Sequence, residues 1–170
     1  MTIVADSSPL VALINIEHIA ILLRLFGSLF IPPPVLAELS SPRRPESVRR
    51  FAANPPSWLQ IRAPRNNPSI PGLHPGEEAA INLATELNAD LLLMDEKEGR
   101  TVAMSRGLTV TGTVGLLERA AEEKALDLRQ AFERLQRTDF WISPALLATR
   151  LQIFEQRQIQ ARPRDPGREH

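Results

Sequence analysis

Short apolar runs alternate with helix-like segments along this chain. Residues 2–5 read Thr-Ile-Val-Ala, residues 91–94 read Leu-Leu-Leu-Met, and residues 108–110 read Leu-Thr-Val. A continuous apolar run is typical of a strand that is covered on both faces, as in a parallel sheet. Strands that alternate with helices therefore predict an α/β fold, with a parallel sheet flanked by helices.

Glycine, proline and serine mark the ends of the expected helices. Gly27 and Gly107 each follow an apolar helical pattern, and Ser143 with Pro144 begins a late helix. One helical pattern follows Asp6, and others span about residues 19–26, 35–39, 74–88 and 113–126. A further helix ends at Arg106, and two or three helices close the chain. Residues 40–72 are rich in proline, arginine and asparagine, which predicts a loop or lid with one short helix near residues 46–53.

Composition limits the choice of class and compartment. A chain of 170 residues with 43% apolar residues suits one domain with a single core. No apolar run reaches eighteen residues and no leader pattern opens the chain, so we expect a cytoplasmic protein without a membrane span. Cysteine is absent, so any metal has to be held mainly by oxygen ligands.

Charge gives a weaker indication of a partner. The formal net charge is zero, which argues against a protein that coats nucleic acid by bulk electrostatics. Nearly all positive charge is arginine, which suits bidentate contacts with phosphate, although GC-rich codon usage gives the same bias. Arg43, Arg44 and Arg65 are the candidate phosphate contacts.

Two aspartates follow apolar strands directly. Asp6 ends the first run and Asp95 ends the run at residues 91–94. Ligands of open parallel sheets bind beyond the carboxyl ends of the strands, so both carboxylates can face one crevice if their strands are neighbours. The alternative is that each aspartate caps the helix that follows it.

Two glutamates lie on predicted helices near this edge. Glu38 lies at the border of the apolar stripe of its helix. Glu77 falls on the apolar side of its helical wheel, whereas Glu78 falls on the polar side and is expected to face solvent. Converging carboxylates need a cation, and oxygen ligands favour Mg²⁺ or Mn²⁺. The set Asp6, Glu38, Glu77 and Asp95 therefore predicts metal-assisted hydrolysis of phosphodiesters or phosphoesters.

The order of these motifs resembles the PIN domain. The motifs are Ala5-Asp6-Ser7-Ser8-Pro9-Leu10, residues 34–39 (Pro-Val-Leu-Ala-Glu-Leu), residues 76–81 (Gly-Glu-Glu-Ala-Ala-Ile) and residues 92–96 (Leu-Leu-Met-Asp-Glu). The stretch from residue 107 to 117 resembles an uncharacterised prokaryotic branch related to the VapC toxins. The resemblance covers residues 1–150; residues 151–170 are then the end of the last helix and a frayed tail.

The resemblance implies a three-layer α/β/α sandwich around a central parallel sheet. It also implies a ribonuclease that uses Mg²⁺ or Mn²⁺ and cleaves single-stranded or structured RNA, with Asp6, Glu38 and Glu77 matching the first three acidic positions. Asp95 is the expected fourth acid, with Glu96 in reserve, and Ser8 and Thr113 are expected to support the pocket or to cap helices. A homodimer, and an antitoxin protein as partner in a type II toxin–antitoxin pair, are further expectations.

Other classes fit the motifs less well. A haloacid-dehalogenase-like phosphatase needs a second aspartate two residues after the first, where this chain has Ser8. A receiver domain needs an acidic pair beside the first strand, a phosphorylated aspartate at a later strand end and a downstream lysine. Lys97 and Lys124 fit the place of that lysine poorly. A serine hydrolase lacks its nucleophile-elbow motif. The remaining alternative is a catalytically inactive PIN-like module that binds nucleic acid or acts as a scaffold.

Overall fold

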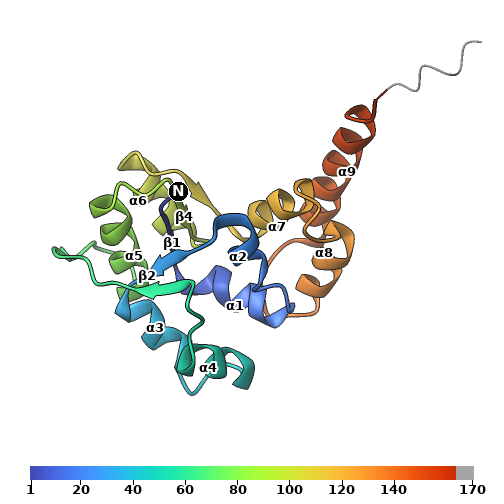
Figure 1. Ribbon diagram of the computed structural model, residues 1–170. Coiled ribbons are helices and arrows are strands. Elements are labelled where there is room, and N and C mark those ends of the chain that lie inside the picture. Colours follow the sequence, from blue (N-terminus) through green and yellow to red (C-terminus); the bar gives the residue numbers. More distant parts are fainter. Residues whose placement is uncertain (164–170) are drawn as a thin grey trace, which may run out of the picture.

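The computed structural model describes residues 1–163 and contains a five-stranded parallel sheet (Figure 1). The strand order is β3-β2-β1-β4-β5, and each of the four pairings is parallel. The strands are β1 (Ile3–Ala5), β2 (Leu29–Ile31), β3 (Leu59–Ile61), β4 (Leu91–Leu93) and β5 (Val110–Thr111). The central strand β1 therefore lies between β2 and β4, and its loops leave the middle of the sheet.

Helices connect the strands and cover the sheet. They are α1 (Ser7–Asn15), α2 (Ile21–Phe26), α3 (Pro33–Leu39), α4 (Glu46–Ala53), α5 (Pro75–Glu86), α6 (Lys97–Ser105), α7 (Thr113–Glu122), α8 (Leu128–Gln136) and α9 (Pro144–Gln160). The result is the expected α/β/α sandwich with a central parallel sheet. In Figure 1, α9 extends outward from the body of the molecule. Among residues 1–163, no helix is both long and apolar enough to cross a membrane.

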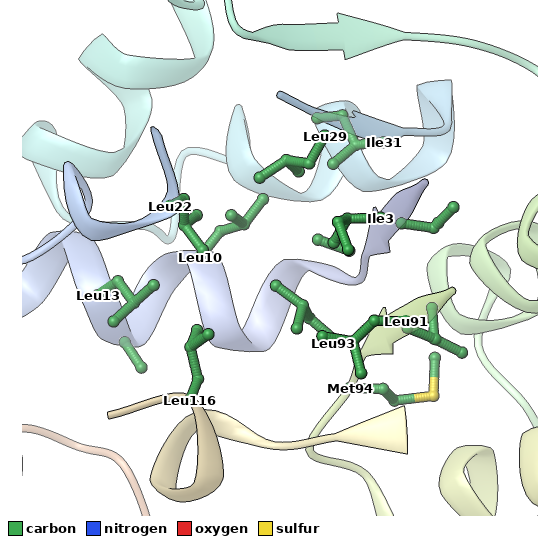
Figure 2. Close-up of a cluster of buried hydrophobic side chains, with 14 of the residues drawn as sticks. Ile3, Leu10, Leu13, Leu22, Leu29, Ile31, Leu91, Leu93, Met94 and Leu116 are labelled. Carbon is green, nitrogen blue, oxygen red and sulfur yellow. The ribbon is translucent and has the colours of Figure 1, made fainter. Parts of the chain in front are cut away.

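The core lies on both faces of β1 and β4. All residues of β1 have no exposed surface, and Leu92 and Leu93 of β4 have none either. Figure 2 shows how side chains from the sheet meet those of α1, α2 and α7, with these residues labelled: Ile3, Leu10, Leu13, Leu22, Leu29, Ile31, Leu91, Leu93, Met94 and Leu116. Burial of this kind stabilises the fold by roughly 1.5–3 kcal/mol per large apolar side chain, so the strand ends that carry polar residues are held rigidly.

Most predicted elements are confirmed. The short helix expected at residues 46–53 is α4, and Gly27 and Gly107 end α2 and α6 with positive φ angles of 76° and 79°. The Ser143 side chain accepts a hydrogen bond from the N–H of Leu146, as an N-cap does. The last predicted strand is shifted, because residues 110–111 rather than 108–110 pair with β4.

Two strands were not predicted. β2 is only three residues long and runs directly into prolines, so no strand period is visible there. β3 lies at the edge of the sheet within the expected loop region, and only Leu59 of its three residues is buried. The part of the expected frayed tail at residues 164–170 lies outside the described residues.

Candidate active site

Asp6 lies at the carboxyl end of the central strand. Its N–H donates a 2.9 Å hydrogen bond to the carbonyl of Leu93, which fixes it beside the end of β4. The residue is 3% exposed, and its Oδ1 accepts a hydrogen bond from no described residue. Its side chain makes no capping hydrogen bond to α1, so the helix-cap alternative does not account for Asp6.

Burial changes the acidity of Asp6. The pKa of its carboxyl group is raised from 3.8 to about 7, mainly by loss of hydration. The hydrogen bond from the backbone N–H of Ser7 opposes this shift, and the charges of Glu38, Glu77 and Asp95 add to it. A carboxylate that loses its hydration gains free energy from an opposite charge nearby. The site therefore favours either a proton or a cation beside Asp6.

Glu38 projects from α3 toward the same edge. Its Oε2 accepts a 2.5 Å hydrogen bond from the Ser7 hydroxyl, and its Oε1 accepts a 3.1 Å hydrogen bond from the N–H of Gly76. A Cβ atom on Gly76 would overlap the Glu38 carboxylate, so a glycine is required for this close approach of α3 and α5. Ser7 and Gly76 together fix the position of the Glu38 carboxylate.

Glu77 lies in the first turn of α5 and is 7% exposed. It forms a capping box with His74, in which the N–H of His74 donates to Glu77 Oε2 over 3.4 Å. Burial raises the pKa of Glu77 and the charges of Glu96 and Glu38 add to the shift, whereas the hydrogen bond and charge of His74 oppose it.

The neighbouring Glu78 points elsewhere. It is half-buried and accepts a 2.8 Å hydrogen bond from the N–H of Ile70, so it holds the preceding loop. The expectation that Glu78 faces solvent is therefore wrong, because a helical wheel does not show a loop folded over the polar side of a helix.

Asp95 is already occupied by protein donors. Its Oδ1 accepts from the N–H of Thr113 over 2.7 Å, and its Oδ2 accepts from the hydroxyls of Thr113 and Ser8 over 2.7 and 3.1 Å. Thr113 is the first residue of α7 and is completely buried. Asp95 therefore ties the start of α7 to the end of β4, with Ser8 and Thr113 as donors. It does not cap α6, the helix that follows it, which has no side-chain cap.

A pocket of about 510 Å³ opens over these carboxylates. Its acidic lining residues are Asp6, Glu38, Glu77, Glu96 and Asp139, and Arg43, Arg44 and His74 also line it. We refer to this space as the acidic pocket. Asp95 is not among its lining residues and instead lines an adjoining groove, so Glu96 presents the fourth central carboxylate to the acidic pocket.

The comparisons with known proteins agree with this architecture. Residues 2–156 match the family model DUF3368, which is described as a PIN domain. The chain belongs to the PIN-domain family. PIN domains are generally nucleases that act on nucleic acids and use divalent metal ions.

A solved structure supports the PIN fold independently. The chain is similar to a PilT N-terminus domain protein from the hyperthermophilic archaeon Sulfolobus solfataricus P2, with 21% sequence identity and a TM-score of 0.55. The match covers 72% of this chain and 95% of that one, and at this identity it shows the fold alone. No match was found among curated proteins.

The acids of this PIN domain offer suitable atoms for a hard cation. The unpartnered, buried Oδ1 of Asp6 and the all-oxygen donor set fit Mg²⁺ or Mn²⁺. Among residues 1–163, however, no three His, Asp or Glu side chains are arranged to hold a metal ion. The expected four acids share one edge of the sheet, but Glu38 and Asp95 direct their oxygens to protein donors.

The roles of two residues of the pocket were not predicted. Ser7, rather than Ser8, binds Glu38, and His74 supplies the cap that orients Glu77. The only signal for Ser7 in the sequence is its position directly after Asp6, the first aspartate. Arg65 lies away from the acidic pocket, and its backbone N–H donates a 2.6 Å hydrogen bond to Glu86. Of the three arginines predicted to contact phosphate, Arg43 and Arg44 line that pocket and Arg65 does not.

Proposed function

We propose that this PIN domain is a metal-dependent endoribonuclease that hydrolyses RNA phosphodiester bonds in the acidic pocket. The observation that carries the proposal is the buried Asp6, whose unpartnered carboxylate oxygen lies at the end of the central strand beside other acids. A buried carboxylate without a partner is costly, and a divalent cation is the partner that hydrolytic sites of this kind use.

Mg²⁺ or Mn²⁺ would be held by Asp6 and Glu77, with Glu38 or Glu96 turning toward it. Glu96 is exposed and can rotate at little cost, whereas Glu38 has to exchange its contact with Ser7. When bound, the cation activates water and polarises the phosphoryl group. Asp95 acts here as a positioning residue that holds α7 and Ser8 at the edge of the pocket.

The other pocket residues bind and orient the substrate. Arg43 and Arg44 also line the pocket and are suited to bidentate contacts with the phosphates beside the scissile bond. His74 holds the backbone at Glu77, so the carboxylate of Glu77 keeps its direction while RNA enters. Neutral overall charge implies few phosphate contacts and thus a modest dependence on salt.

A second function is favoured by one observation. Because two of the expected acids are occupied by protein donors and no ready ligand set exists in residues 1–163, a catalytically inactive module that binds RNA is the alternative.

The proposal further includes a cytoplasmic homodimer acting as the toxin of a type II pair, with an antitoxin protein as partner. A small neighbouring gene with a DNA-binding pattern would support the toxin role.

The test is RNA cleavage by the purified protein with Mn²⁺, with Mg²⁺ and with EDTA. We expect cleavage with either metal, none with EDTA, none in Glu77→Gln, and nearly normal cleavage in Glu78→Gln. Glu78 is the matched control because it is adjacent in sequence but bound to the loop. Equal cleavage by both variants would indicate a contaminating nuclease, and binding of RNA without cleavage would favour the inactive module.

A further inference from the structure

A second hollow adjoins the acidic pocket and is larger, at about 860 Å³. The two spaces share the lining residues Ser8, Glu96, Asp139 and Phe140, so they lie side by side. The second hollow runs past the N-terminal ends of α6, α7 and α9 and is lined by Lys97, Arg100, Gly112, Gly115, Trp141, Leu146 and Arg150 among others. We refer to it as the Trp141 groove.

Trp141, the tryptophan of this groove, does not pack into the core of the fold. Trp141 is 95% exposed, on the connection between α8 and α9, while the other tryptophan of the chain, Trp58, packs against Phe51 with ring centroids 6.1 Å apart. An exposed tryptophan ring offers apolar surface that a partner can cover with a gain in binding free energy. Because Trp141 lies beside a candidate nuclease site, the partner we expect is a nucleic acid.

The groove holds the basic residues Lys97, Arg100 and Arg150 beside the acidic residues Asp95, Glu96 and Asp139. Lys97 is exposed and forms no ion pair within residues 1–163, whereas Arg100 donates to the carbonyl of Met94 and Arg150 pairs with Glu118. Gly112 and Gly115 belong to the lining, and the Arg100 guanidinium and the Asp95 carboxylate occupy the space beside Gly112. The groove therefore places an exposed lysine without an ion pair and an exposed aromatic ring beside the acidic pocket.

We propose that the Trp141 groove binds the single-stranded segment of RNA that leaves the acidic pocket, with an unpaired base stacked on Trp141 and a phosphate near Lys97. This proposal rests on the proposed function and adds to it a binding site for the strand beside the cleavage site. Bases in a duplex stack on each other and do not offer their faces, whereas unpaired bases stack readily on aromatic side chains. Trp141 thus selects against paired RNA beside the cleavage site.

The test is binding of a labelled 12-nucleotide RNA of mixed sequence, as a single strand and as a blunt duplex, followed by fluorescence anisotropy. Loss of one base–aromatic stack weakens binding by roughly 5- to 150-fold, so we expect Trp141→Ala to raise the dissociation constant for the single strand at least fivefold. Trp141→Phe should retain most affinity, and the duplex should bind weakly to all three proteins. Met104→Ala is the control, because Met104 is 54% exposed but lines neither space.

The outcomes separate this inference from the proposed function. Unchanged single-strand affinity in Trp141→Ala overturns the groove even if metal-dependent cleavage is present. Weaker single-strand binding in Trp141→Ala supports the groove even if no cleavage occurs. A change in oligomeric state on ultracentrifugation, without a change in RNA affinity, overturns the proposal in favour of a protein interface.

Discussion

Replacing Asp6 by asparagine should stabilise the protein in the absence of metal while removing its ability to bind metal. The carboxylate of Asp6 is buried, unpartnered at Oδ1 and surrounded by other acids, so its negative charge is unfavourable in the folded state. Asparagine has nearly the same shape and no charge. The substitution therefore removes repulsion and leaves the packing around β1 in place.

The magnitude follows from the pKa of Asp6. Its folded value of about 7 exceeds the unfolded value of 3.8, so the folded state binds the proton more tightly and loses stability as the pH rises from about 4 to 7. At about 1.36 kcal/mol per pKa unit, a shift of about three units costs up to roughly 4 kcal/mol above pH 7. The gain of Asp6→Asn should thus be near zero at pH 4 and largest at pH 8.

The assay is thermal unfolding in EDTA at pH 4.5 and pH 8, with and without added Mn²⁺ in a parallel series. For a domain of this size, 1 kcal/mol corresponds to about 2–4 °C, so the full effect would raise the melting temperature by roughly 8–16 °C at pH 8. Asp127→Asn is the control, because the exposed Asp127 caps α8 through the N–H of Gln130 and asparagine caps equally well.

Two results would refute this reasoning. If Asp6→Asn melts far below the wild type at pH 8 without metal, Asp6 is a structural residue whose carboxylate is needed by the fold. If the variant gains the same stability at both pH values, the gain does not come from the charge. In either case the buried carboxylate would no longer indicate a cation site.

Three further substitutions test other parts of the structure. Thr113→Val removes one hydroxyl bond to Asp95 and should lower the free energy of unfolding by about 1–3 kcal/mol, measured in urea. Asn82→Ala breaks the side-chain contacts that hold the loop before α5 and should speed proteolysis of that loop with a similar loss of stability; unchanged cleavage would show that the loop is held otherwise. Arg44→Ala should weaken RNA binding and reduce its salt dependence, whereas Arg65→Ala should do neither, because Arg65 binds Glu86 away from the acidic pocket.

The alternation of helices with β1, β4 and β5 could be predicted because local signals and the global fold agree there. β1 and β4 are buried on both faces, so their residues are continuously apolar and stand out in the sequence. The end of α2 was visible for a different reason, since Gly27 adopts a positive φ of 76°. β2 and β3 carry no such signal, because β2 runs directly into three prolines and two of the three residues of β3 are exposed.

The candidate site was partly visible for the same reason. The neighbouring positions of β1 and β4 bring Asp6 and Asp95 to one edge, as the strand-end argument required. The sequence did not show which carboxylates remain available to bind a cation, because that depends on hydrogen-bond donors far away in the chain. Ser7 reaches Glu38 across 31 residues of sequence, and Thr113 reaches Asp95 across 18. Periodicity describes one element at a time and cannot show such contacts.

The most direct test of the central claim is calorimetric titration of Mn²⁺ into the metal-free protein. We predict saturable binding to the wild type and to Glu78→Gln, and its loss in Glu77→Gln, because Glu77 is buried beside the acidic pocket while Glu78 is bound to the loop. Absence of binding to the wild type, or equal binding to all three proteins, would contradict the account of the acidic pocket as a metal-dependent nuclease site.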